Sequence, residues 1–175
     1  RDTVTAELQT ENIMLNNFEK LLESCVGPLV GNGIEITQVK KEQRGRYALM
    51  IGGTAIADKR LELMLQWEPQ PFGALMMAVP FPITGYRPEL RPHVLEMINA
   101  LNCDSTRIST ALLIEGDHDI RALTRLSFIL HPEYLTDEAW RFSKELIRTN
   151  VMMLVNEMAT ACAMVSTGDE LVGTA

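Results

Sequence analysis

The chain has 175 residues, of which 46% are hydrophobic and 22% are charged, as in ordinary globular proteins. This length predicts one domain that buries a sizeable core without a disulfide or a structural metal ion. The net charge is −7 and there is no basic stripe, which argues against nucleic acid or an anionic membrane surface as a partner.

Three features of the sequence bear on where the protein is found. The chain starts at Arg1 rather than Met, so we expect a trimmed N-terminus, and it has no signal segment. No apolar run reaches the roughly 18 residues that a membrane-spanning helix needs. Cys25, Cys103 and Cys162 are odd in number and far apart, which predicts reduced thiols. The sequence therefore predicts a cytoplasmic protein.

The first half of the chain predicts one helix followed by strands. Apolar residues at steps of three and four predict a helix over residues 5–26, which Gly27 and Pro28 end. Residues 27–33 are rich in glycine, but they follow a helix instead of a strand, so we interpret them as a loop and not a phosphate cradle. Residues 73–79 are nearly all apolar, which predicts a central strand covered on both sides. Alternating patterns predict further strands over residues 34–39, 47–51 and 60–67.

The second half predicts a helix, a strand pair and a long last helix. The second helix is expected to begin at about Glu89, because Pro92 is tolerated only in a first turn. Thr136 is the expected N-cap of the last helix. The predicted segments are strands over 106–114 and 119–130, a turn over 115–118, a helix over 137–164 and a disordered tail over 166–175.

These elements predict an α+β fold. It consists of a twisted antiparallel sheet of five to six strands with three helices, in the order α-β-β-β(-β)-α-β-β-α. Residues 1–175 are expected to form a single α+β domain, apart from the tail at 166–175.

Few residues suggest catalysis or metal binding. The densest group of possible ligands comprises Glu115, Asp117, His118 and Asp119. A calcium loop needs a longer spaced set and zinc usually takes more His or Cys, so a solvated turn is the favoured interpretation. His93 and His131 each lie next to a proline, with no pattern that would orient a general base. The sequence therefore predicts no catalytic residue, no cofactor and no metal site.

The predicted last helix carries more apolar side chains than one sheet face can cover. Met side chains adapt to irregular surfaces, so such a surplus suits an interface as well as a core. Either the first helix lies across this surface, or the surface forms a dimer seam or a groove for a client peptide. The candidate interaction surface consists of Trp140, Met152, Met153 and Met158.

A short motif gives the sequence a family resemblance. Asn99 and Asn102 form an Asn-x-x-Asn pair near the end of the predicted second helix, and the strand pair and last helix follow at regular spacing. Over about residues 61–155 this resembles the YbjN family of candidate bacterial sensory transduction regulators. The chain departs from the family by an extra strand-like segment at 34–51, and by Ala100 and Leu101 where an aromatic residue is usual.

The resemblance implies a fold like that of the type III secretion chaperones, which are small acidic homodimers that hold extended segments of effector proteins. It implies no catalytic residue and no cofactor. Asn99 and Asn102 are carried over only as candidate capping residues near the helix end.

Two functions of different classes remain open. The leading hypothesis is a non-enzymatic protein-interaction module with a regulatory or chaperone-like role, which binds a protein partner or client peptide and forms a homodimer. The partner would bind on an exposed sheet face, along the last helix or at a sheet edge. The alternative is a small-molecule-binding domain with a pocket between sheet and helices near Trp67, Phe72 and Tyr86. An enzyme with an unrecognised site is the weakest possibility.

Overall fold

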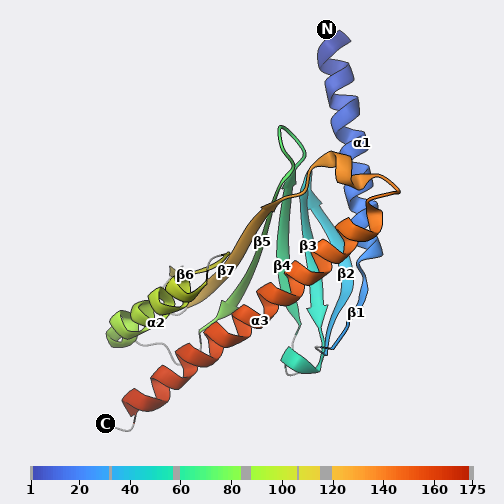
Figure 1. Cartoon of the computed structure of the whole chain (residues 1–175). Helices are drawn as coiled ribbons and strands as arrows, with labels where there is room; N and C mark the ends of the chain where they lie inside the picture. The colour runs from blue at the N-terminus through green and yellow to red at the C-terminus, as the bar shows by residue number, and fades with distance from the viewer. Residues whose placement is uncertain are drawn as a thin grey trace. The chain divides into compact units, whose positions relative to one another are not determined.

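A computed structural model describes residues 2–31, 33–56, 60–83, 88–105, 107–114 and 120–173. Three helices and seven strands occur in this described part (Figure 1). Their bounds are α1 Asp2–Ser24, β1 Gly27–Leu29, β2 Ile34–Gln43, β3 Arg46–Gly52, β4 Leu61–Glu68, β5 Ala74–Pro82, α2 Arg91–Asp104, β6 Ile108–Ile114, β7 Ile120–Ile129 and α3 Trp140–Gly173.

The strands form one sheet in the order β1-β2-β3-β4-β5-β7-β6. Pairing is antiparallel between β1 and β2, β2 and β3, β3 and β4, and β6 and β7. The α+β class and the order of the elements are confirmed. The strand count is seven, which is higher than the predicted five to six.

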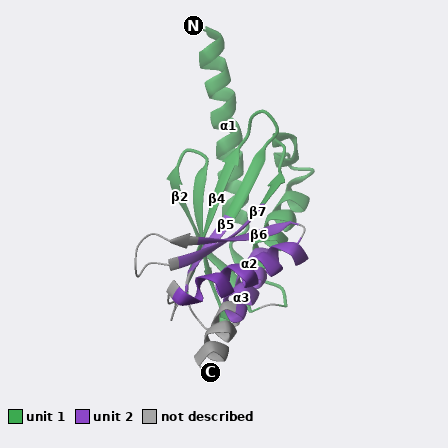
Figure 2. Cartoon of the chain, turned by 90° about the vertical axis from the view of Figure 1, so that its left-hand side faces the viewer, with its two compact units in different colours: residues 1–77, 127–152 green, residues 78–126, 153–175 purple. Residues whose placement is uncertain are grey.

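The chain divides into two compact units, which we describe separately (Figure 2). Unit 1 comprises residues 1–77 and 127–152, and unit 2 comprises residues 78–126 and 153–175. Strands β5 and β7 and helix α3 are each divided between the two units. No helix within the described residues is long and apolar enough to cross a membrane.

The additional strand is β1, which the sequence placed in a loop. Its Leu29 pairs with Ile34 of β2, and both side chains are buried. The guanidinium of Arg148 donates hydrogen bonds to the carbonyl oxygens of Cys25, at 2.7 Å, and Pro28. The loop prediction is therefore wrong for residues 27–29. A strand of three residues is too short to show an alternating pattern.

The helix boundaries differ slightly from those predicted. Helix α2 begins at Arg91 and holds Pro92 in its first turn, as expected. Helix α3 begins at Trp140, and its first turn is closed by a hydrogen bond from the Ser143 N–H to the Ala139 carbonyl oxygen, so Ala139 and not Thr136 directly precedes the helix. The backbone of α3 is helical as far as Gly173, through most of the segment for which a disordered tail was expected.

The core of unit 1 lies on one face of the sheet, which we call the inner face. Phe18 of α1 stacks on Trp67 of β4, with ring centroids 4.5 Å apart, and meets Tyr47 of β3 edge-on at 5.5 Å. The Trp67 indole N–H donates to the Leu130 carbonyl oxygen at 3.0 Å. These aromatic contacts fix α1 against the inner face, since each buried ring has a packing partner and the indole is hydrogen bonded.

The first part of α3 packs beside the end of α1. The Cys25 thiol lies 3.9 Å from the backbone oxygen of Lys144, and Ile147 and Val151 are fully buried. Both helices lie on the inner face (Figure 1). The opposite face of the unit 1 strands, which we call the outer face, carries the alternate side chains.

In unit 2, helix α2 packs against the strands through a small apolar cluster. Leu90, Val94 and Ile98 are buried there, and Ile83 and Leu112 pack against them. Beside this cluster the hydroxyls of the buried residues Thr110 and Thr124 lie 3.3 Å apart. The core of unit 2 therefore includes a buried pair of polar side chains.

Candidate functional site

The four residues of the candidate interaction surface are divided between the two units. Trp140 and Met152 lie in unit 1 and are half-buried, whereas Met153 and Met158 lie in unit 2. Met158 is only 6% exposed, so it offers little area to a partner. Met152 lines a hollow of about 190 Å³ together with Leu29, Val30, Glu145, Arg148 and Thr149.

Asn102 has a role other than capping the helix. Its side-chain nitrogen donates to the Thr110 carbonyl oxygen at 2.9 Å, and its side-chain oxygen accepts from the Thr110 N–H at 2.7 Å. Thr110 is opposite Thr124 on β7. Because its N–H and C=O both bond to Asn102, they point away from β7, as in a pair of opposite residues that share no backbone hydrogen bond. Asn102 therefore occupies the place of a neighbouring strand at the edge of the sheet. Asn99 is exposed.

A second side chain protects the same edge. The Ser105 hydroxyl accepts a hydrogen bond from the Ile108 N–H at 3.0 Å. Because β6 is the end strand of the sheet, its outward backbone groups would otherwise be available to another strand. The end of α2 thus closes β6 at Ile108 and Thr110.

The residues that could carry chemistry are dispersed. Burial raises the pKa of the Cys25 thiol to about 11, and Arg148 offsets only part of this effect, so Cys25 is unsuited to be a nucleophile. The His131 Nδ1 accepts a hydrogen bond from the Glu133 N–H at 3.2 Å. In the described part of the chain, no three His, Cys, Asp or Glu side chains come together as a metal site. The group Glu115, Asp117, His118 and Asp119 lies outside the described residues.

Trp67 helps to line an open hollow, but most of its side chain is packed in the core. The Trp67 side chain is 1% exposed and packs on Phe18, while Phe72 is 66% exposed and Tyr86 lies outside the described residues. This hollow has a volume of about 320 Å³ and lies beside α1, at the turn between β2 and β3 and the end of β4. Its lining is mostly polar and includes an ion pair between Glu11 and Arg44 at 2.9 Å.

Among the possible sites, the outer face of unit 1 differs most from what the sequence predicts. Residues 73–79 were expected to be covered on both sides. This is wrong at Ala74, which is exposed, and at Met76, which is 37% exposed, whereas Ala78 on the same side of β5 is buried. Ile129 on β7 is 57% exposed and Met64 on β4 is 36% exposed. Each lies on a strand whose alternate residues fill the inner core.

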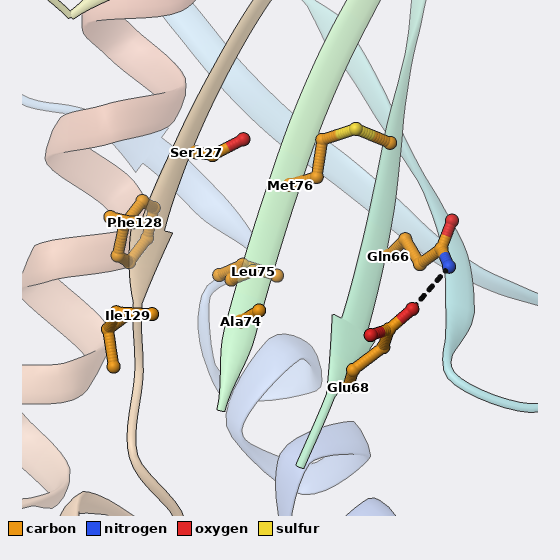
Figure 3. A pocket seen from close by; sticks show the side chains of 8 residues that line it. All are labelled: Gln66, Glu68, Ala74, Leu75, Met76, Ser127, Phe128 and Ile129. Carbon is orange, nitrogen blue, oxygen red and sulfur yellow. Dashed lines mark hydrogen bonds between the residues drawn. The ribbon is translucent and has the colours of Figure 1, made fainter. Parts of the chain in front are cut away.

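A hollow of about 390 Å³ lies at one end of this face (Figure 3). Strands β4, β5 and β7 supply its lining residues Gln66, Glu68, Ala74, Leu75, Met76, Ser127, Phe128 and Ile129. The Gln66 side-chain nitrogen donates to a Glu68 carboxylate oxygen at 3.2 Å, as the dashed line in Figure 3 marks. The hollow therefore combines apolar side chains with one oriented carboxylate.

Gly73 brings the strands together at this end of the hollow. Its φ is +78°, and a Cβ atom placed there would lie 2.0 Å from the Leu130 carbonyl oxygen. The Leu130 N–H donates to the Gly73 carbonyl oxygen at 2.8 Å. Only glycine combines this backbone conformation with so close an approach. Gly73 therefore allows β5 and β7 to lie close together next to Ala74 and Ile129.

The outer face had a partial signal in the sequence. Alternation in residues 60–67 placed Glu62 and Gln66 opposite the apolar stripe, which is the face that the structure shows as outer. Met64 lies on the same face, where an apolar residue in an outward position could have marked an interaction surface.

Comparisons with known proteins concern the fold. Solved structures similar to this one include the crystal structure of YbjN from E. coli, described as a candidate transcription regulator. The TM-score is 0.44, the sequence identity is 14%, and the alignment covers 83% of this chain and 92% of that chain. No protein-family model and no curated protein matches the chain.

Proposed function

We propose that the chain is a non-enzymatic protein-interaction module with a regulatory or chaperone-like role. It binds side chains of a protein partner or client peptide on the outer face of unit 1. The observation that carries this proposal is that β5 is apolar on both faces, yet Ala74 and Met76 stay exposed on one of them. A strand with this composition is normally covered on both sides.

The residues of the outer face suit the binding of varied partners. Met64 and Met76 are unbranched and polarizable, so they adjust to partner side chains of different shape. Burying a Met or Ile side chain contributes about 1.5–3 kcal/mol. Met64, Met76 and Ile129 are 36%, 37% and 57% exposed. Completing their burial against a partner would therefore contribute a few kcal/mol to the free energy of binding.

Addition of a partner strand at a sheet edge has less support. Asn102 and Ser105 close β6 at one end of the sheet. At the other end, β1 pairs with only residues 34–36 of β2. The rest of β2 has two register shifts and carries Lys40 and Lys41, features that oppose strand addition. Recognition by side chains on the outer face is therefore the favoured mode.

A homodimer is part of the same proposal, and helix α1 supports it. Val4 and Leu8 lie on the same stripe as the buried residues Leu15, Phe18 and Leu22, at alternating steps of three and four when Glu11 is included. Yet residues 2–10 are all exposed. Most of the stability of a helix in a protein comes from packing of its apolar face, and a second copy could bury Val4 and Leu8 on this stripe.

The cytoplasm is the proposed location. The odd number of widely separated cysteines suits a reducing compartment, and the exposed thiol of Cys103 would be prone to oxidation elsewhere.

Site-specific photocrosslinking tests the proposed binding face. A photoreactive amino acid replaces Ile129 in one variant and the exposed Lys20 of α1 in a control variant. We expect adducts with a defined protein partner, or with a second copy, from position 129 and not from position 20. Equal yields from both positions would contradict binding on the outer face.

Light scattering tests the homodimer. A mass of twice 19.6 kDa is expected for the native chain, and Leu8→Glu should shift it towards that of one chain. A native mass of 19.6 kDa at high concentration would exclude the homodimer.

A small-molecule-binding domain is the second candidate function, and the hollow beside Glu11 and Arg44 is the observation that favours it. Small-molecule pockets are usually mostly apolar and enclosed, so this open polar hollow gives weaker support. Protection of the Glu11–Arg44 region from hydrogen exchange by a metabolite mixture would favour this function.

A further inference from the structure

We infer that the hollow on the outer face binds a short partner segment in which an arginine lies next to an aliphatic residue. This inference rests on the proposed function and names the partner chemistry that the hollow fits. The occupant is a peptide segment of a protein partner that is basic and apolar.

The charge at the hollow is the first argument. Glu68 is exposed and carries the one formal charge among the residues that line the hollow. Gln66 donates to one of its two carboxylate oxygens at 3.2 Å, which orients the group and leaves the second oxygen for a partner. A guanidinium matches a carboxylate by parallel N–H donors, and it also bonds the oxygen of a neighbouring amide.

The apolar side of the hollow is the second argument. Ala74, Met76 and Ile129 lie on β5 and β7, across the hollow from Glu68 on β4 (Figure 3). Met76 and Ile129 keep 37% and 57% of their area exposed, so an aliphatic side chain can still bury both. The volume of about 390 Å³ lies at the small end of the range for binding pockets, about 300–1,000 Å³. It suits a few side chains instead of a whole domain.

The net charge of the chain is the third argument. At −7, the protein attracts cationic segments at long range and repels acidic ones. Two cations flank the lining residues on this side of the strands, and neither lines the hollow: Arg46 pairs in register with Gln66 on β4, and the exposed Arg125 precedes Ser127 by two residues on β7. Arg46 should therefore weaken the binding of a basic segment, opposite to the effect of Glu68.

Peptide titration followed by amide NMR shifts tests the inference. The probes are three octapeptides of the same length that alternate leucine with arginine, with glutamine or with glutamate. We expect the arginine peptide to shift the amides of residues 66–68, 74–76 and 127–129, and the glutamate peptide to shift none of them. The affinity for the arginine peptide should fall with added salt.

Three matched variants identify the contributing groups. Glu68→Gln should weaken the binding of the arginine peptide about tenfold, which is the scale of one charge-assisted hydrogen bond. Ile129→Thr should weaken it severalfold, and Arg46→Gln should leave it unchanged or strengthen it. All three positions are exposed, so an unchanged amide spectrum outside the site will confirm that each variant is folded.

The possible failures are distinguishable. If the glutamine peptide binds the same amides as tightly and Glu68→Gln has no effect, the outer face binds partners but the basic chemistry is wrong. If Arg46→Gln weakens binding as much as Glu68→Gln does, the inference is also overturned. If no peptide shifts these amides and crosslinking from position 129 yields no adduct, the proposed function fails as well.

Discussion

Unit 1 covers its strands with side chains on one face, whereas unit 2 covers its end strand with hydrogen bonds along the edge. In unit 1, Phe18 and Trp67 stack on the inner face, and the outer face keeps Met76 and Ile129 exposed. In unit 2, Asn102 and Ser105 bond to the outward backbone groups of β6. The closed part is thus a backbone edge and the open part is a side-chain face. This difference supports our proposal that a partner is bound by side chains on the outer face rather than by an added strand.

The largest expected effect comes from removing the aromatic core of unit 1. Trp67→Ala deletes the stack with Phe18 and the hydrogen bond to Leu130, so it should lower the free energy of unfolding by about 3–5 kcal/mol. Urea denaturation measures the change. Phe72→Ala is the control, since Phe72 is exposed and its loss should stay within about 0.5 kcal/mol. Similar losses in both variants would show that the stack does not support unit 1.

The next effect is a loss of stability at high pH through Cys25. Its folded pKa of about 11 exceeds its ordinary value of 9.0 because of burial. The folded state therefore keeps the proton that the unfolded state releases as pH rises above 9. The contribution of Cys25 to stability is fully present below pH 9 and should decline by about 2 kcal/mol by pH 11.

The measurement determines the free energy of unfolding of the native chain and of Cys25→Ala between pH 7 and 11. The two proteins are compared by the slope of this free energy against pH. Burial and Glu19 also raise the pKa of Tyr47, so the variant should keep a residual slope of the same sign. Identical slopes in the two proteins would exclude a role for Cys25.

A smaller effect is expected from opening the edge of unit 2. Asn102→Ala leaves the N–H and C=O of the buried residue Thr110 without these two bonds, and should lower the free energy of unfolding by about 1–2 kcal/mol. It should also promote association through β6, which light scattering can follow. Asn99→Ala is the matched control on the same helix, and a loss as large as that of Asn102→Ala would argue against edge protection.

The smallest expected effect on stability is at the outer face of unit 1. Ile129→Thr keeps a β-branched residue at a position that is 57% exposed, so the free energy of unfolding should change by less than about 0.5 kcal/mol. Binding to the outer face should nevertheless fall. A large loss of stability would mean that Ile129 belongs to the core of the unit and not to a binding surface.

Much of the fold is predictable from local patterns in the sequence. Helical periodicity locates the three helices and alternation locates the strands β2 to β7 except β5, because burial of one face imposes these periods; a continuous apolar run locates β5. Strand β1 escapes because its pairing depends on Leu29 meeting Ile34, and three residues carry no period. The role of Asn102 escapes because its partner Thr110 is across the turn that follows α2, and a motif does not specify which backbone group an amide will bond.

The candidate site is less predictable than the fold. The composition of residues 73–79 shows that both faces of a strand can be covered, but not whether the covering surface belongs to the same chain. Likewise, the spacing of Met152, Met153 and Met158 places them on one helix without showing that Met158 is buried. Each of these outcomes depends on tertiary packing, which local periodicity does not encode.

The pair of bonds between Asn102 and Thr110 also makes the protein sensitive to chemical ageing. Hydrolysis of the Asn102 amide would replace the nitrogen that donates to the Thr110 carbonyl with an oxygen that cannot donate. A carboxylate would then face a carbonyl oxygen, and the end of α2 would be pushed away from β6. A stored sample would thus acquire an unprotected strand when water replaces ammonia at one side chain, and its aggregates would be enriched in chains that carry aspartate at this position.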